Sequence, residues 1–134
     1  MSTDLVPPVL AALDSLRACF PGNEIFVEPD GAGGARVAVE AVELSDLYNQ
    51  DHTWVAGHLV PQLPYADIYP LFVRGDLARR DARPLGTGLS AGHMFLGRGA
   101  IQASRRSTRR DPAIEQAGHK FLKVVEWLRT HPGT

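Results

Sequence analysis

Two short runs of alternating apolar and polar residues, separated by a glycine-rich turn, constrain this chain more than any other feature. Residues 24–28 read EIFVE, and in residues 35–44 the apolar Val37 and Val39 alternate with Arg36 and Glu40. The turn between the runs is PDGAGG. Because successive side chains of a strand point to opposite faces, this pattern predicts an antiparallel β-hairpin.

Two further strands are predicted downstream of the hairpin. Residues 53–60 (TWVAGHLV) and residues 69–73 (YPLFV) are short and rich in β-branched and aromatic side chains. The connection PQLPYADIYP contains three prolines, which exclude regular structure there. The four runs together predict a four-stranded antiparallel meander.

An N-terminal helix is expected over residues 2–20. Thr3 or Asp4 can cap it, and Pro7 and Pro8 are tolerated in a first turn. Pro21-Gly22 ends it. Apolar residues recur at steps of three and four and form one stripe: Val6, Val9, Leu10, Leu13, Leu16 and Phe20.

A C-terminal helix is expected to open at Asp111-Pro112, a good cap followed by proline in the first helical position, and to end before Pro132-Gly133. Its predicted buried stripe is Ile114, Ala117, Phe121, Leu122, Val125 and Leu128. Its predicted water-facing residues are Glu115, His119, Lys120, Lys123, Glu126 and Arg129.

The remaining segment, residues 74–98, has no periodicity and gathers glycine, arginine and proline, so we expect a long irregular loop. The predicted fold class is therefore α+β: an N-terminal helix, a four-stranded antiparallel meander, a long irregular segment and a C-terminal helix. A length of 134 residues fits a single domain over 1–134.

Composition limits the compartment and the redox chemistry. The apolar fraction of 44% and the charged fraction of 22% are those of a soluble globular protein. No apolar run approaches the roughly 18–20 residues that span a bilayer, and no basic and apolar leader begins the chain. The single cysteine, Cys19, forms no internal disulfide. We therefore expect a cytoplasmic protein without membrane contact.

Charge is segregated along the chain. Residues 1–60 hold two arginines against nine acidic residues, and residues 74–110 hold nine arginines against Asp76 and Asp81. Such a division is typical of proteins that present oppositely charged surfaces to partners. The alternative is that the two halves neutralise each other across the fold, and the sequence leaves both open.

Catalytic and metal-binding motifs are weak. Residues 88–92 (GLSAG) match the G-x-S-x-G nucleophile motif, but no strand precedes them and the chain is too short for the parallel sheet that this motif needs. A glycine-rich loop is the simpler interpretation. The glycines near residues 31–34 and 86–88 lead into no helix and are interpreted as turns rather than phosphate loops. The five histidines lack metal-ligand spacing, so no metal or cofactor is expected.

The segment 99–112, GAIQASRRSTRRDP, carries four arginines that could bind phosphates. However, no aromatic residues are interleaved with them and the chain is not basic overall. A protein partner is the preferred interpretation over nucleic acid, and a plain solvated loop also fits.

The order of these elements resembles the ubiquitin-conjugating (UBC) fold, in which a proline- and tyrosine-containing segment separates the third and fourth strands. The chain is most similar to the divergent bacterial conjugating-enzyme-like proteins that are encoded beside ubiquitin-like modifiers. The residues that carry this resemblance, from about Ile25 to Leu128, are Leu47-Tyr48-Asn49, Leu63-Pro64, Gly97-Arg98, Gln102-Ala103-Ser104-Arg105-Arg106 and Asp111-Pro112.

The resemblance also exposes a departure from the family. A conjugating enzyme carries its modifier as a thioester on a cysteine after the fourth strand, and this position should fall near Gln102, Ala103 and Ser104, where no cysteine occurs. His93 would lie near the histidine-containing motif of the family, but Met94 and Phe95 do not reproduce its proline and asparagine. Cys19, in the first apolar stripe, is expected to be buried and inert.

Three functions remain open at this point. The first is a catalytically inactive subunit that binds the ubiquitin-like modifier, an active conjugating enzyme or an activating enzyme; a role in anti-phage defence is implied only by the family. The second is an active enzyme that carries the modifier as an oxyester on Ser104 with His93 as base. The third is an arginine-rich adaptor for nucleic acid. The residues expected to contact a partner are Arg98, Arg105, Arg106, Arg109 and Arg110.

Overall fold

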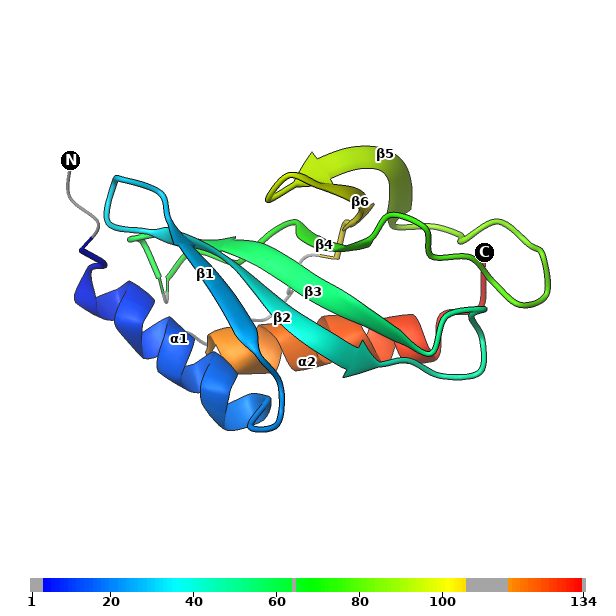
Figure 1. Cartoon of the computed structure of the whole chain (residues 1–134), viewed down its shortest axis with the longest axis horizontal. Coiled ribbons are helices and arrows are strands. Elements are labelled where there is room, and N and C mark those ends of the chain that lie inside the picture. Colours follow the sequence, from blue (N-terminus) through cyan, green and yellow to red (C-terminus); the bar gives the residue numbers. More distant parts are fainter. Residues whose placement is uncertain (1–3, 64, 106–115, 134) are drawn as a thin grey trace.

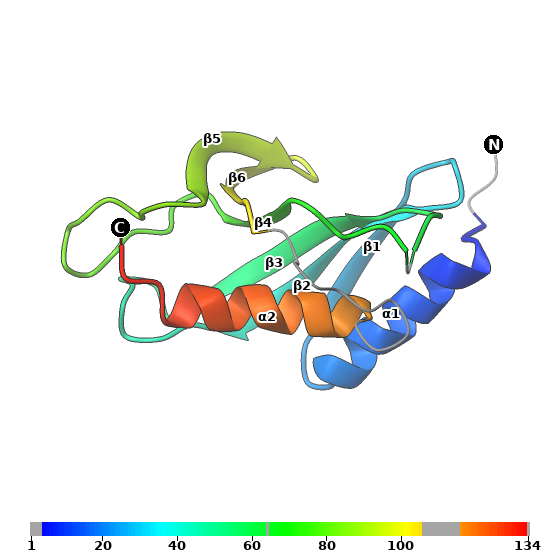
Figure 2. The same cartoon turned by 180° about the vertical axis from the view of Figure 1, so that it is seen from behind.

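A computed structural model describes residues 4–63, 65–105 and 116–133. Two helices lie on one face of an antiparallel sheet (Figure 1; Figure 2 shows the reverse side). In chain order the elements are α1 (Pro7–Cys19), β1 (Ile25–Pro29), β2 (Ala35–Glu43), β3 (His52–Leu59), β4 (Leu71–Arg74), β5 (Leu89–Phe95), β6 (Arg98–Ala103) and α2 (Ala117–Arg129).

The sheet has six strands in the order β1-β2-β3-β4-β6-β5, so the expected sheet of four strands is wrong in number. The expected irregular segment 74–98 is also corrected, since β5 lies within it and forms a hairpin with β6. Leu96 and Gly97 form the tight turn of this hairpin, with φ angles of 54° and 71°. Strand β5 lacks a clear alternation in the sequence because its pairing with β6 shifts register between Ser90 and His93.

The first helix begins later than expected. α1 starts at Pro7 behind Val6, with proline in its first turn as predicted but without a side-chain cap from Asp4. α2 starts at Ala117, where Gln116 and His119 form a reciprocal capping box. The expected caps Thr3, Asp111 and Pro112 lie outside the described residues.

The core lies between the helices and one face of the sheet, and it confirms most of the predicted apolar stripes. Phe121 of α2 is fully buried, as are Val9 and Leu16 of α1. Lys120 was expected to face water, and this prediction is wrong, because its side chain is 4% exposed. Its Nζ lies 3.2 Å from Asp67 Oδ2 and donates a hydrogen bond of 2.6 Å to the carbonyl oxygen of Arg105.

Asp30 holds the turn between β1 and β2 and joins it to β3. Its Oδ1 accepts hydrogen bonds from the amides of Ala32 (2.7 Å) and Gly34 (3.0 Å), and its Oδ2 lies 2.6 Å from His58 Nε2. The hydrogen bond with His58, followed by those of the two amides, lowers the pKa of Asp30 below its usual range.

Replacing Asp30 with alanine is therefore expected to lower the free energy of unfolding at neutral pH by about 2 kcal/mol, since a charged acceptor of several hydrogen bonds is lost. A depressed folded-state pKa stabilises the protein above the unfolded pKa of about 3.9, and this contribution disappears as the pH falls through the folded-state value. The free energies of unfolding of wild type and variant, measured with urea, should therefore become equal at acidic pH.

The control for this experiment is Asp14→Ala, which removes an exposed carboxylate whose only described ion pair is a 3.5 Å contact with Arg17. This change should alter the unfolding free energy by no more than about 0.5 kcal/mol. Equal losses in the two variants, or a loss in Asp30→Ala that is independent of pH, would contradict the role assigned to Asp30.

Candidate functional site

The face of the sheet opposite the helices carries the hairpin of β5 and β6, which curls away from the layer of α1 and α2 (Figures 1 and 2). Residues paired across the strands place one row of side chains on this face: Phe26, Ala38, Ala56, Phe72, Gln102 and Ser90. Aromatic and polar side chains therefore share this face around the buried Ala38 and Ala56, and neither of the two described helices packs on it.

An ion pair ties the tip of the hairpin to this surface. Arg98 donates two hydrogen bonds to Glu40, of 2.9 and 2.7 Å, and this pairing raises the pKa of the guanidinium. The same guanidinium lies 5.2 Å from the ring centre of Trp54 and 5.8 Å from that of Phe26. Arg98 thus joins the second half of the chain to strands from the first half.

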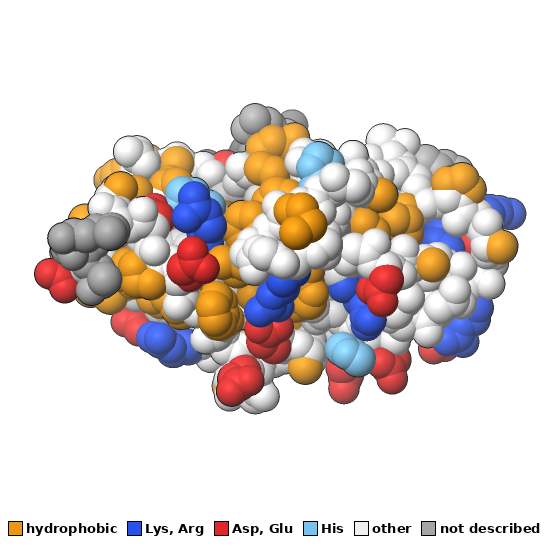
Figure 3. Space-filling model, turned by 45° about the horizontal axis from the view of Figure 1, so that its top comes forward, with side chains coloured by type: hydrophobic (Ala, Val, Ile, Leu, Met, Phe, Trp, Pro, Cys, Tyr) orange, Lys and Arg blue, Asp and Glu red, His pale blue; other side chains and the backbone are white. Residues whose placement is uncertain are grey.

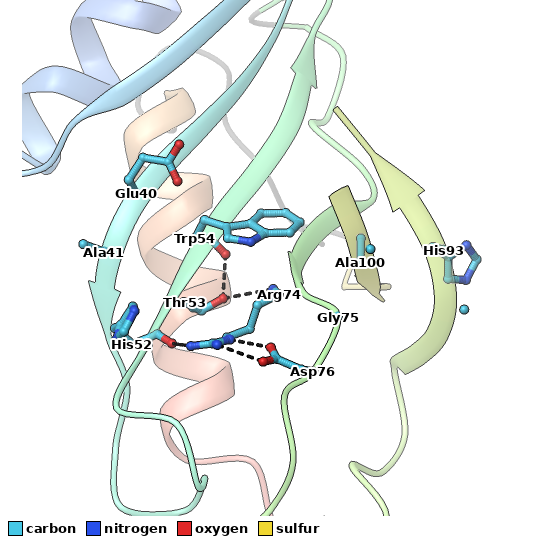
Figure 4. A pocket seen from close by; sticks show the side chains of 12 residues that line it. Glu40, Ala41, His52, Thr53, Trp54, Arg74, Gly75, Asp76, His93 and Ala100 are labelled. Carbon is cyan, nitrogen blue, oxygen red and sulfur yellow. Dashed lines mark hydrogen bonds and ion pairs between the residues drawn. The ribbon is translucent and has the colours of Figure 1, made fainter. Parts of the chain in front are cut away.

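A cleft of about 640 Å³ opens beside this ion pair, between strands β2 to β4 and the hairpin (Figure 4). Arg74 spans part of it and donates to both carboxylate oxygens of Asp76, at 2.6 and 2.9 Å, and to the carbonyl oxygen of His52 at 3.0 Å. Hydrogen bonding from Arg74 lowers the pKa of Asp76. Both carboxylates of the cleft, Glu40 and Asp76, are therefore already paired with arginine.

The position expected for a catalytic cysteine lies in strand β6. Gln102 pairs with Phe72 on one side and with Ser90 on the other, and Ala103 is buried. The backbone amide of Ser104 donates to the carbonyl oxygen of Gly88 at 2.7 Å, and its hydroxyl accepts a 2.9 Å hydrogen bond from the Gln102 side chain. Gln102 and Ala103 are thus held in a strand ladder, and Ser104 is tied to Gly88 and Gln102 just after the strand ends.

The single thiol lies elsewhere in the fold. Cys19 is the last residue of α1, is partly buried, and packs against the core beside α2. A side chain at Gly118 of α2 would meet the Cys19 sulfur, so the two helices approach closely at this point. Cys19 was expected to be buried, and it is only partly buried.

His93 and Ser90 are brought together by the structure, although no sequence pattern pairs them. His93 Nε2 lies 3.2 Å from the Ser90 hydroxyl oxygen, and the imidazole is tilted by 60° against the ring of Phe72 at 6.4 Å. Residues 89–92 of the G-x-S-x-G motif lie in strand β5, so the interpretation of the motif as a glycine-rich loop is wrong, and the motif is not on a strand-turn-helix elbow either. The register shift that places residues 90 and 93 on one face has no signal in the sequence pattern.

Some of the arginines form ion pairs within the fold, and others are exposed to solvent. Arg98 is held by Glu40, and Arg74 and Arg79 pair with acids two residues further on. Arg105 is exposed, and its guanidinium lies 5.7 Å from the ring centre of Trp127. Three other expected partner contacts, at positions 106, 109 and 110, lie outside the described residues. Basic and acidic side chains lie side by side on the face turned forward in Figure 3, so neutralisation prevails there.

The described residues limit other kinds of site. They contain no cluster of histidine, cysteine and carboxylate side chains suited to a metal ion. Neither of the two described helices is long and apolar enough to cross a bilayer. Comparison of the chain with profiles of known protein families, with curated proteins and with solved structures gives no match.

Proposed function

We propose that this protein is a catalytically inactive, UBC-like subunit of a ubiquitin-like conjugation pathway. It acts by binding the ubiquitin-like modifier, an active conjugating enzyme or an activating enzyme. The proposal is compatible with the α+β architecture, in which one helix precedes an antiparallel sheet and one follows it.

One observation carries the proposal: the chain has no thiol where a conjugating enzyme needs one. Residues 102–104 contain no cysteine, and Gln102 and Ala103 belong to a strand that is paired on both sides. The one thiol, at Cys19, belongs to the helix layer. A thioester requires an accessible thiolate, because sulfur is nucleophilic near neutral pH and its ester stays reactive. A UBC-like protein without this group retains only its binding surfaces.

The proposed binding surface centres on Arg105, and Arg106, Arg109 and Arg110, which lie outside the described residues, are proposed as further contacts. Arg105 is exposed, whereas Arg98 must leave Glu40 before it can contact a partner. The exposed Arg105 guanidinium, which lies over the Trp127 ring, favours a partner with carboxylates, because its hydrogen bonds to carboxylate are charge-assisted. The partner surface is therefore expected to be acidic.

The test combines binding with charging. The full chain is mixed with candidate ubiquitin-like modifiers and conjugating enzymes, and binding is measured by calorimetry. In parallel it is incubated with modifier, activating enzyme and ATP, and adducts are separated with and without thiol reductant. We expect binding to at least one component and no adduct of the modifier on this chain.

Charge reversal at Arg105 should weaken the interaction. Arg105→Glu is expected to raise the Kd for the partner about tenfold or more, because a charge-assisted contact becomes a repulsive one. The matched control is Arg83→Glu, whose side chain is 66% exposed but lies outside the proposed surface. This control should change the Kd by less than about threefold.

Three results would contradict the proposal. A thiol-stable adduct that disappears in Ser104→Ala would indicate oxyester chemistry at Ser104. Nucleic-acid binding with a steep salt dependence, without affinity for any pathway protein, would support the adaptor instead. If Arg105→Glu and Arg83→Glu changed the Kd for the partner equally, Arg105 would not belong to the binding surface.

A further inference from the structure

We propose that Ser90 is a nucleophile that His93 activates for acyl transfer from activated esters. The 3.2 Å distance between His93 Nε2 and the Ser90 hydroxyl oxygen is that of a nucleophile hydrogen-bonded to its base. The step does not involve conjugation of a modifier. Its failure would therefore leave the binding function above untouched, and loss of partner binding would leave this step untouched.

Ser90 is more exposed to solvent than His93, as expected for a nucleophile that must reach a substrate and a base that must be held in place. Ser90 is exposed, so its oxygen can reach a substrate carbonyl carbon. His93 is only partly exposed, its backbone pairs with Ala100 of β6, and its ring lies beside that of Phe72. The base is thus restrained by the hairpin, while the nucleophile remains open to solvent.

The bulge in β5 is what places Ser90 and His93 next to each other. The register shift between Ser90 and His93 brings both side chains to one face and leaves Ala91 and Gly92 unmatched in the pairing with β6. Gly92 adopts φ of 85°, a left-handed conformation that suits glycine.

The proposed reaction has two balanced stages. The Ser90 oxygen attacks the ester carbonyl carbon while its proton moves to His93 Nε2. The bond to the leaving alcohol then breaks, and that alcohol takes the proton from His93, which leaves acyl-Ser90. Water next attacks the same carbon with His93 as base, and cleavage of the bond to Ser90 releases a carboxylic acid and restores the hydroxyl.

The substrate class that we expect follows from the surroundings of His93. Among the described residues, no carboxylate makes a hydrogen bond or ion pair with His93, so the imidazolium formed in the reaction gains no ionic partner there. Such a pair can act on esters with good leaving groups but not on amides. The stacked rings of Phe72 and Phe95, 4.6 Å apart, provide apolar surface next to His93 and favour an aryl ester.

The experiment incubates the full chain with 4-nitrophenyl acetate and locates the acetyl group by mass spectrometry after trypsin digestion. Ser90 is the only serine between Arg80 and Arg98, and Ser104 falls in the separate peptide 99–105, so the two hydroxyls are distinguished. We expect acetyl-Ser90 in the folded chain and none in the chain labelled in denaturant. His93→Gln should slow labelling about a hundredfold, the usual contribution of a general base.

Two variants complete the design. Ser45→Ala, at a serine whose hydroxyl donates to the carbonyl of Arg129, should label as fast as wild type. Ser90→Cys keeps a nucleophile beside His93 and should label at least as fast as wild type. The proposal is overturned if the acetyl group is found on Ser104 or lysines instead of Ser90. It is also overturned if denatured and folded chains label Ser90 equally, or if His93→Gln leaves the rate unchanged.

Discussion

Replacing Asp67 with alanine is expected to lower the free energy of unfolding by about 2–4 kcal/mol, because the buried ammonium group of Lys120 loses a charged partner. The side chain of Lys120 is 4% exposed and that of Asp67 is 16% exposed, so water cannot readily replace the missing group. The carbonyl oxygen of Arg105, which also accepts from Lys120 Nζ, carries no formal charge, whereas the Asp67 carboxylate does. Urea or thermal unfolding measures the loss.

A second substitution tests whether the buried charge is the cause. Because methionine matches the length of the lysine stem without its charge, Asp67→Ala combined with Lys120→Met should recover at least about half of the lost stability. Glu126→Ala is the control, since it removes a surface carboxylate, 67% exposed, from an ion pair with Arg129. It should cost no more than about 1 kcal/mol. If Asp67→Ala cost as little as this control, the ion pair with Asp67 would not be what stabilises the buried Lys120.

Gly118→Ala is expected to destabilise the protein by about 1–3 kcal/mol, although the same change in an exposed helix would add about 1 kcal/mol of stability. A Cβ atom at this position would meet the backbone carbonyl oxygen of Ser15 and the sulfur of Cys19. Because one of these contacts is backbone, α1 and α2 would have to move apart. Thermal unfolding of the variant shows whether the substitution lowers or raises the stability.

The matched control is Gly22→Ala, where a Cβ atom would meet nothing within 4 Å. It should change the unfolding free energy by less than about 0.5 kcal/mol. Combining Gly118→Ala with Cys19→Ala should restore only part of the loss, because the Ser15 carbonyl remains in place. A net gain of stability in Gly118→Ala would show that the helices can separate at little cost.

Sequence patterns located the first four strands to within two residues, because each is a short apolar run bounded by glycine, proline or charged residues. Strands β5 and β6 escaped prediction for a physical reason. Residues 89–95 contain Gly92 and a bulge that breaks the two-residue period, and β6 finds its neighbours only through pairing with β4 and β5. Strand pairing of this kind is not encoded in local periodicity.

The residues of the candidate site could be named from the sequence, but which of them lie next to each other could not. Ser90 and His93 were both noted from the sequence, but the base was expected beside Ser104, whereas the described hydrogen bond joins it to Ser90. Lys120 was assigned to the polar face because lysine is rarely buried. Its burial depends on Asp67, which lies 53 positions earlier in the chain, and no helical pattern reports such a partner.

The sequence by itself determined the α+β class, the two helices, the first hairpin and the single thiol, since these follow from residue types and local periods. Only the tertiary structure decided which arginines are neutralised and which hydroxyl meets a histidine. Arg98 reaches Glu40 across 58 positions, and the β5 bulge turns Ser90 toward His93. Such contacts depend on how distant strands pair and how the hairpin curls, and short-range patterning carries no information about either.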